Sequence, residues 1–266
     1  MRLFTSIFIL LLFTATNAGA EIVVLVHGFK SSSQDWYNSG VIDQLQNQGW
    51  RPGGHYRYYP QGVMGPASRA EGENLIYTVD LPNTAPVMLQ VGYLHAVLQS
   101  IEAIAPKDTL NLVGHSAGGV VARAVMVIHP EHTIARLITI AAPHLGSSAA
   151  SVGSLVASTP LSMMADMLGQ DELAHSGQLL SELSPPTSGN FLFWLNQQPH
   201  PPALHYISLV RTNNPMFGGD NLVSPQSQDL RNVVNLGSRA VSYSTPGSHS
   251  LQAQDGDLIG HLLMQP

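Results

Sequence analysis

Short apolar segments recur along this chain, separated by stretches long enough to form helices. Residues 22–26 are a continuous run of β-branched residues and leucine, typical of a strand that is buried on both faces. Strands separated by helix-length segments favour an α/β fold, in which βαβ units build a mostly parallel sheet flanked by helices. We expect further strands at residues 55–59, 76–81, 109–113, 134–140, 204–210 and 232–236, and helices at 35–48, 87–105 and 118–129.

One region interrupts this alternation. Residues 147–202 lie between two expected strands but are too long for a single crossover, and they contain clustered methionine and aromatic residues. We therefore expect an inserted helical cap over about 147–202, within one domain that spans residues 21–266. The methionines could grip an acyl chain, since methionine adapts to irregular apolar shapes, or they could be ordinary core residues.

The first twenty residues have the pattern of a secretory signal peptide. Arg2 precedes an apolar stretch at residues 3–13, and Ala18-Gly19-Ala20 supplies a cleavage pattern of small residues. The stretch is shorter than the about 20 apolar residues of a membrane-spanning helix. A buried first strand and an uncleaved anchor are the alternatives. The chain has no cysteine, so an exported fold would hold without disulfides. We predict a secreted or periplasmic protein.

Composition excludes some classes of partner. Only 11% of residues are charged, the formal net charge is −6, and there is no basic run, which argues against a nucleic-acid partner. The 12 histidines are scattered along the sequence and form no cluster with metal-ligand spacing. We expect neither a metal nor a cofactor, and the composition leaves the oligomeric state open.

The most specific motif is the G-x-S-x-G pentapeptide Gly114-His115-Ser116-Ala117-Gly118. An expected strand leads into it and an expected helix leads out, which is the context that a nucleophile requires on a tight strand-to-helix turn. The glycines avoid side-chain clashes, and the free N–H groups of the helix N-terminus lie where negative charge develops. The motif predicts that Ser116 is a nucleophile.

A serine nucleophile needs a base and an orienting acid, which in this arrangement follow in the order Ser, Asp or Glu, His. We choose Asp220 as the acid because it lies in a Gly-rich loop after the expected strand 204–210. We choose His249 as the base because it lies in a loop between the expected strand 232–236 and a final helix. Asp229 and Asp255 remain alternatives to the acid, and His261 to the base. We interpret His175, His200 and His205 as packing or surface residues.

An acyl-transfer site also needs N–H donors for the tetrahedral oxyanion. The backbone N–H of Ala117, directly after the nucleophile, supplies one. The second should come from the loop after the first strand, where Gly28 lets the backbone approach closely. We therefore choose the N–H of Phe29 as the second donor.

Three segments together resemble the bacterial lipase and esterase family of the α/β-hydrolase superfamily. They are Val24-Leu25-Val26-His27-Gly28-Phe29, Leu112 to Gly119 around the nucleophile, and Ile140-Ala141-Ala142-Pro143-His144-Leu145-Gly146-Ser147. The resemblance implies an α/β-hydrolase fold with a mobile lid, hydrolysis of acylglycerols or other carboxylic esters, and a structural His144. Some lipases of this group hold calcium with an Asp two residues after the catalytic His. Leu251 stands there, so this motif gives calcium no support.

We therefore predict a serine ester hydrolase that forms an acyl-enzyme and needs no cofactor. Its partners would be a lipid or small acyl-ester substrate and, transiently, a lipid interface. A phospholipase, thioesterase or lipid-anchor deacylase would use the same residues, and an amidase or peptidase would require a worse leaving group. A catalytically silent binding protein on the same scaffold is the alternative from another class.

Overall fold

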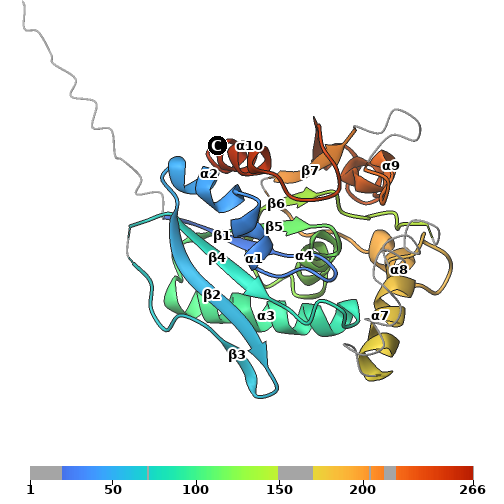
Figure 1. Cartoon of the computed structure of the whole chain (residues 1–266), viewed down its shortest axis with the longest axis horizontal. Coiled ribbons are helices and arrows are strands. Elements are labelled where there is room, and N and C mark those ends of the chain that lie inside the picture. The colour runs from blue at the N-terminus through green and yellow to red at the C-terminus, as the bar shows by residue number, and fades with distance from the viewer. Residues whose placement is uncertain (1–19, 71, 149–169, 204, 213–219, 266) are drawn as a thin grey trace, which may run out of the picture.

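The computed structural model describes residues 20–70, 72–148, 170–203, 205–212 and 220–265. A single eight-stranded sheet in the order β3-β2-β4-β1-β5-β6-β7-β8 runs through its centre (Figure 1). Neighbouring strands pair in parallel, except for the antiparallel pair β2 and β3. The strands are β1 Glu21–Val26, β2 Arg51–Tyr59, β3 Gly62–Met64, β4 Leu75–Asp80, β5 Thr109–His115, β6 Ile134–Ile140, β7 His205–Arg211 and β8 Ala240–Thr245.

Helices cover both faces of the sheet, which confirms the predicted α/β class (Figure 1). Helices α3 (Val87–Ile104) and α4 (Ala117–Ile128) bury their apolar residues in one core cluster. Helices α1 (Gln34–Asn38), α2 (Val41–Asn47) and α10 (Ala253–Leu263) contribute to the other. The central strands alternate between the two clusters, so Val24 belongs to the first and Val23 and Leu25 to the second. This explains why residues 22–26 of β1 read as a continuous apolar run.

Two sequence predictions need correction. The helix expected at 35–48 is two helices, because Gly40 breaks it with a φ of +79° that favours glycine. The strand expected at 232–236 is wrong, since a 3-10 helix, η1 (Leu230–Asn232), and turns occupy this segment. Its buried Val233 and Leu236 are apolar because they pack on the first core. The last strand is β8, an edge strand with several partly exposed residues, so it lacks the apolar run that marks the central strands.

The expected cap is only partly within the described residues, since 149–169 lie outside them. The described part contains α7 (Gln170–Glu182) and α8 (Phe191–Gln197), which begins where the Asn190 side chain accepts a hydrogen bond from the N–H of Phe193. Four leucines from this region, Leu179, Leu183, Leu192 and Leu195, are buried in the first core cluster. The segment predicted as a signal peptide also lies outside the described residues, apart from Ala20.

Candidate active site

Ser116 occupies the turn between β5 and α4. Its φ of +51° and ψ of −127° are a conformation that residues with a side chain rarely adopt, and its N–H donates to the carbonyl of Ile140 at 2.8 Å. The turn presents the side chain at the carboxyl end of the strand, above the N-terminus of α4. This is the strained geometry that the pentapeptide predicts.

The glycines of the pentapeptide allow very close backbone contacts. A Cβ on Gly114 would lie 2.5 Å from Cα of Gly119, and one on Gly118 would collide with the backbone carbonyl of His27. The residue after β1 therefore packs directly on the start of α4, and only glycine fits at these positions.

The structure brings Ser116, His249 and Asp220 together from three separate segments. Nε2 of His249 lies 2.8 Å from Oγ of Ser116, and its Nδ1 lies 2.6 Å from Oδ2 of Asp220. Because an ionised carboxylate only accepts hydrogen bonds, Nδ1 of His249 carries the proton and Nε2 accepts from the serine hydroxyl. This arrangement can move the hydroxyl proton to the imidazole while Asp220 holds the ring in place.

The Asp220 carboxylate is fully buried and has several donors. Its Oδ1 accepts from the N–H groups of Leu222 at 2.9 Å and Val223 at 2.8 Å, and its Oδ2 also accepts from Nε2 of Gln228 at 3.2 Å. Burial by itself would raise the pKa of Asp220, but the hydrogen bond and charge of His249 and these N–H donors hold it below the ordinary value. The carboxylate therefore stays ionised at neutral pH.

The alternative acids are engaged elsewhere. Asp255 is fully buried in a two-pronged ion pair with Arg211, with N–O distances of 2.7 and 2.6 Å. Asp229 pairs with Arg231 at 2.7 Å and accepts from its N–H at the start of η1. Neither hydrogen-bonds His249.

Among the remaining histidines named from the sequence, those whose side chains the structure describes are not at the hydroxyl of Ser116. His261 is exposed on α10 and its Nδ1 donates to the carbonyl of Asp257 at 2.7 Å. His144 is fully buried, with Nε2 3.0 Å from Oγ1 of Thr139, and burial together with nearby Arg123 lowers its pKa well below the ordinary value. Nδ1 of His200 bonds the carbonyl of Gln198, and His205 begins β7. His175 lies in α7, and its side chain is outside the described part.

Two residues that sequence reasoning did not single out support the His249 loop. His115 is buried, and its Nε2–H donates to the carbonyl oxygen of His249 at 2.7 Å. Burial, followed by the charge of His249, lowers the pKa of His115 to about 3, so the ring is neutral. Arg211 donates to the carbonyl of Ser250 at 3.1 Å while it pairs with Asp255. The sequence signal that could have identified His115 as a supporting residue is its position inside the pentapeptide, directly before Ser116.

The predicted oxyanion donors, Phe29 and Ala117, flank the serine. Both line the same cavity as Ser116 and His249, and within the described part of the chain neither backbone N–H has an acceptor. Gly28 makes this close approach possible, because a Cβ there would lie 3.0 Å from Cβ of Ser116. Free N–H groups beside a hydroxyl can hold a developing oxyanion.

The cavity at Ser116 has a volume of about 50 Å³ and mostly apolar walls. Leu180 and Leu183, from the region expected as a cap, form part of the wall. The calcium position of the resembling lipases is apolar here, since Leu251 packs against the second core cluster. Within the described residues, a group of side chains able to hold a metal is instead found at His95, Glu131 and His132.

Comparison with known proteins agrees with this fold. A family model described as "PGAP1-like alpha/beta domain" matches residues 17–158, which include β1, β5 and the Ser116 turn. No curated protein matches the sequence. Similar solved structures include the mature Bacillus licheniformis lipase BlEst2, with 19% identity and a TM-score of 0.59 over 93% of this chain and 91% of that one.

Two more structures show the same architecture. The metagenomic carboxyl esterase MGS0156 has 12% identity and a TM-score of 0.56 over 93% of this chain and 75% of that one. The phospholipase PlaB from Legionella pneumophila has 17% identity and a TM-score of 0.53 over 80% of this chain and 45% of its own. These likenesses confirm the predicted α/β-hydrolase fold.

Proposed function

The chain belongs to the PGAP1-like alpha/beta domain family, and from this premise we propose that it is a serine carboxylic-ester hydrolase with Ser116 as its nucleophile. The observation that carries the proposal is the continuous hydrogen-bond chain from Ser116 through His249 to Asp220, at 2.8 and 2.6 Å. It ends on a strained nucleophile turn beside free backbone N–H groups, a combination that serves acyl transfer.

In the proposed mechanism, His249 takes the proton of Ser116 as Oγ attacks the ester carbonyl carbon. The N–H groups of Phe29 and Ala117 hold the resulting oxyanion, and the Asp220 carboxylate stabilises the imidazolium. The carbon–oxygen bond to the alcohol then breaks, and His249 gives the alcohol its proton. Water repeats these steps on the acyl-enzyme, releasing the acid and restoring the serine hydroxyl.

The apolar cavity favours an ester with a hydrophobic acyl group. Its walls include Leu180, Leu183, Leu222 and Val223, which can contact an acyl chain but offer no side-chain hydrogen bond. The similar structures described above include a lipase, a carboxyl esterase and a phospholipase, which is consistent with a lipid or small acyl-ester substrate.

Hydrolysis of a p-nitrophenyl ester series from short to long acyl chains tests the proposal, using residues 21–266 and the matched Ser116→Ala variant. We expect turnover by the native sequence and a loss of several orders of magnitude in kcat for the variant. Chain-length preference then separates an esterase from a lipase, and parallel phospholipid, thioester and amide substrates separate the alternatives. Equal inactivity of two folded proteins on every substrate would contradict the proposal and favour a binding protein.

We also propose that the protein is exported after cleavage following Ala20. The sequence pattern of residues 1–20 supports this, and β1 begins at Glu21, whose N–H donates to Oδ1 of Asn74 at 2.9 Å. Cleavage and export are tested by measuring the intact mass of the protein in separate cell fractions. We expect a chain that begins at Glu21 outside the cytoplasm, and a full-length chain in the cytoplasm would contradict export.

A further inference from the structure

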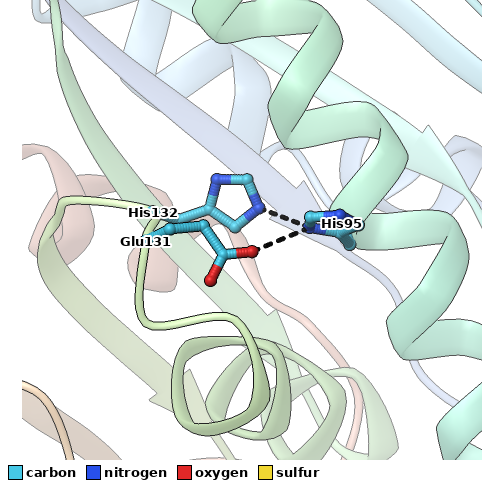
Figure 2. A group of neighbouring side chains, drawn as sticks. All are labelled: His95, Glu131 and His132. Atoms are coloured by element: carbon cyan, nitrogen blue, oxygen red, sulfur yellow. Dashed lines mark hydrogen bonds and ion pairs between the residues drawn. The ribbon is translucent and has the colours of Figure 1, made fainter.

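Far from Ser116, ligand-type side chains from two segments meet. His95 projects from α3, while Glu131 and His132 come from the connection between α4 and β6 (Figure 2). Nδ1 of His95 lies 2.7 Å from Nε2 of His132 and 3.9 Å from Oε1 of Glu131. All three ligand atoms lie within 4.8 Å of one another, close enough for one ion to bind them all. The scattered histidines of the sequence are thus partly gathered by the fold.

Each ligand from the connection is oriented by an outer partner. Nδ1 of His132 lies 2.8 Å from Oε1 of Glu102, which is seven residues after His95 on α3. Because Glu102 accepts the Nδ1 proton, Nε2 of His132 keeps its lone pair directed at the cluster. Nδ1 of His129 lies 3.0 Å from Oε1 of Glu131 and orients that carboxylate. A histidine ligand whose second nitrogen binds a carboxylate is the usual outer arrangement of protein metal sites.

The electrostatics also suit a cation. The cluster follows the C-terminus of α4, the negative end of that helix dipole.

We propose that His95, His132 and Glu131 bind a divalent transition-metal ion of the Zn²⁺ type. Two imidazole nitrogens and one carboxylate oxygen are ligands that Zn²⁺ takes readily, with water in the fourth position. Ca²⁺ and Mg²⁺ prefer oxygen ligands and fit this set poorly. The His132 side chain is 1% exposed and the Glu131 side chain is 58% exposed. The site therefore combines one buried ligand with one ligand that is open to solvent.

The ion would act structurally rather than in the ester chemistry. Helix α4 begins directly after Ser116 and ends before His129, and its 12 residues span about 18 Å. A metal joining His95 to His132 would fix the far end of this helix to α3. The proposal does not depend on Ser116 being a nucleophile, because metal binding is measured without a substrate.

The test is calorimetric titration of metal-stripped residues 21–266 with ZnCl₂ at pH 7. We expect one Zn²⁺ per chain, no comparable heat from Ca²⁺ or Mg²⁺, and a rise in Tm of about 5–10 °C at free Zn²⁺ a hundredfold above Kd. The absence of stoichiometric binding by the folded protein would overturn the proposal.

Matched variants locate the site. His95→Gln and Glu131→Gln should abolish the stoichiometric binding, and Glu102→Gln should weaken it about 10- to 100-fold by releasing His132. His261→Gln is the control, because His261 is exposed on α10, where it lies 3.7 Å from the Asp257 carboxylate and away from the cluster. The His261→Gln protein should bind Zn²⁺ as the native protein does. Binding that survives both His95→Gln and Glu131→Gln would overturn the assignment, because the ion would then lie elsewhere.

Discussion

Nε2 of His115 lies 2.7 Å from the carbonyl oxygen of His249, so the residue before the serine holds the backbone of the residue that hydrogen-bonds the serine. The nucleophile turn and the His249 loop are therefore linked twice, once through side chains and once through this buried hydrogen bond. Since reacting groups must be held within fractions of an ångström, we assign His115 a positioning role.

Removing this link should slow catalysis without removing the fold. We expect His115→Leu to lower kcat on a p-nitrophenyl ester about 10- to 100-fold, with KM little changed, because His249 loses its backbone support. His115→Gln should recover much of the loss, since its amide N–H can reach the same carbonyl. A His115→Leu enzyme within twofold of the native kcat would contradict the positioning role.

The lowered pKa of His115 should make the stability of the protein depend on pH. Burial, followed by the charge of His249, holds the pKa of His115 at about 3 when folded, below the ordinary 6.5, so the unfolded chain takes up the proton first as pH falls. The free energy of unfolding should therefore fall as pH drops from 6.5 towards 3. Between pH 7 and 5 this group should remove about 2 kcal/mol.

Urea unfolding at both pH values measures this effect. His115→Gln should lose about 2 kcal/mol less than the native sequence over the same interval, because it has no proton to bind. The difference between the two proteins isolates His115 from the other buried histidines. Equal losses for both would contradict a neutral buried ring.

The ion pair of Arg211 and Asp255 should matter for folding stability. Both side chains are fully buried, so Arg211→Met leaves a buried carboxylate without its partner and should cost about 3–5 kcal/mol. Adding Asp255→Leu should recover part of this cost, because no unpaired charge remains. Chemical denaturation of both variants measures it, and a loss below about 1 kcal/mol for Arg211→Met would count against the buried pair.

Replacing Gly118 or Gly92 with alanine should change the stability of the protein in opposite directions. Gly118→Ala places a Cβ against the carbonyl of His27 and should cost at least about 3 kcal/mol or prevent folding. Gly92→Ala on α3 meets no atom within 4 Å and should stabilise the protein by about 0.5–1 kcal/mol. Thermal unfolding compares the two, and a Gly118→Ala protein as stable as the native one would contradict the tight turn.

How much could be predicted from sequence depended on whether the signal was local. The strands β1, β5 and β6 were predicted because both of their faces are buried, and most of their residues are apolar for that reason. Strand β8 was not predicted because this edge strand has no continuous apolar run. Val233 and Leu236 lie in a turn, but their buried apolar side chains led to the wrong prediction of a strand at 232–236.

The candidate site divides in the same way. Ser116 carries a local motif, and the loop position of Asp220 follows from chain order and the strand pattern. His249 was chosen by chain order and by an expected strand at 232–236 that is wrong; its loop follows β8 instead. The support from His115 and Arg211 depends on contacts across 134 and 39 residues of sequence. The His95 cluster likewise joins α3 to a loop 37 residues later in the sequence, and this contact could not be predicted from sequence spacing.

The most direct test of the account is covalent capture of the nucleophile. Residues 21–266 are treated with a fluorophosphonate ester, and intact mass and peptide mapping locate the adduct, with Ser116→Ala and His249→Gln beside it. The account predicts one adduct per chain on Ser116, none in Ser116→Ala, and labelling slowed by orders of magnitude in His249→Gln. A folded native protein that takes no label, or takes it on another residue, would contradict the assignment of Ser116 as nucleophile.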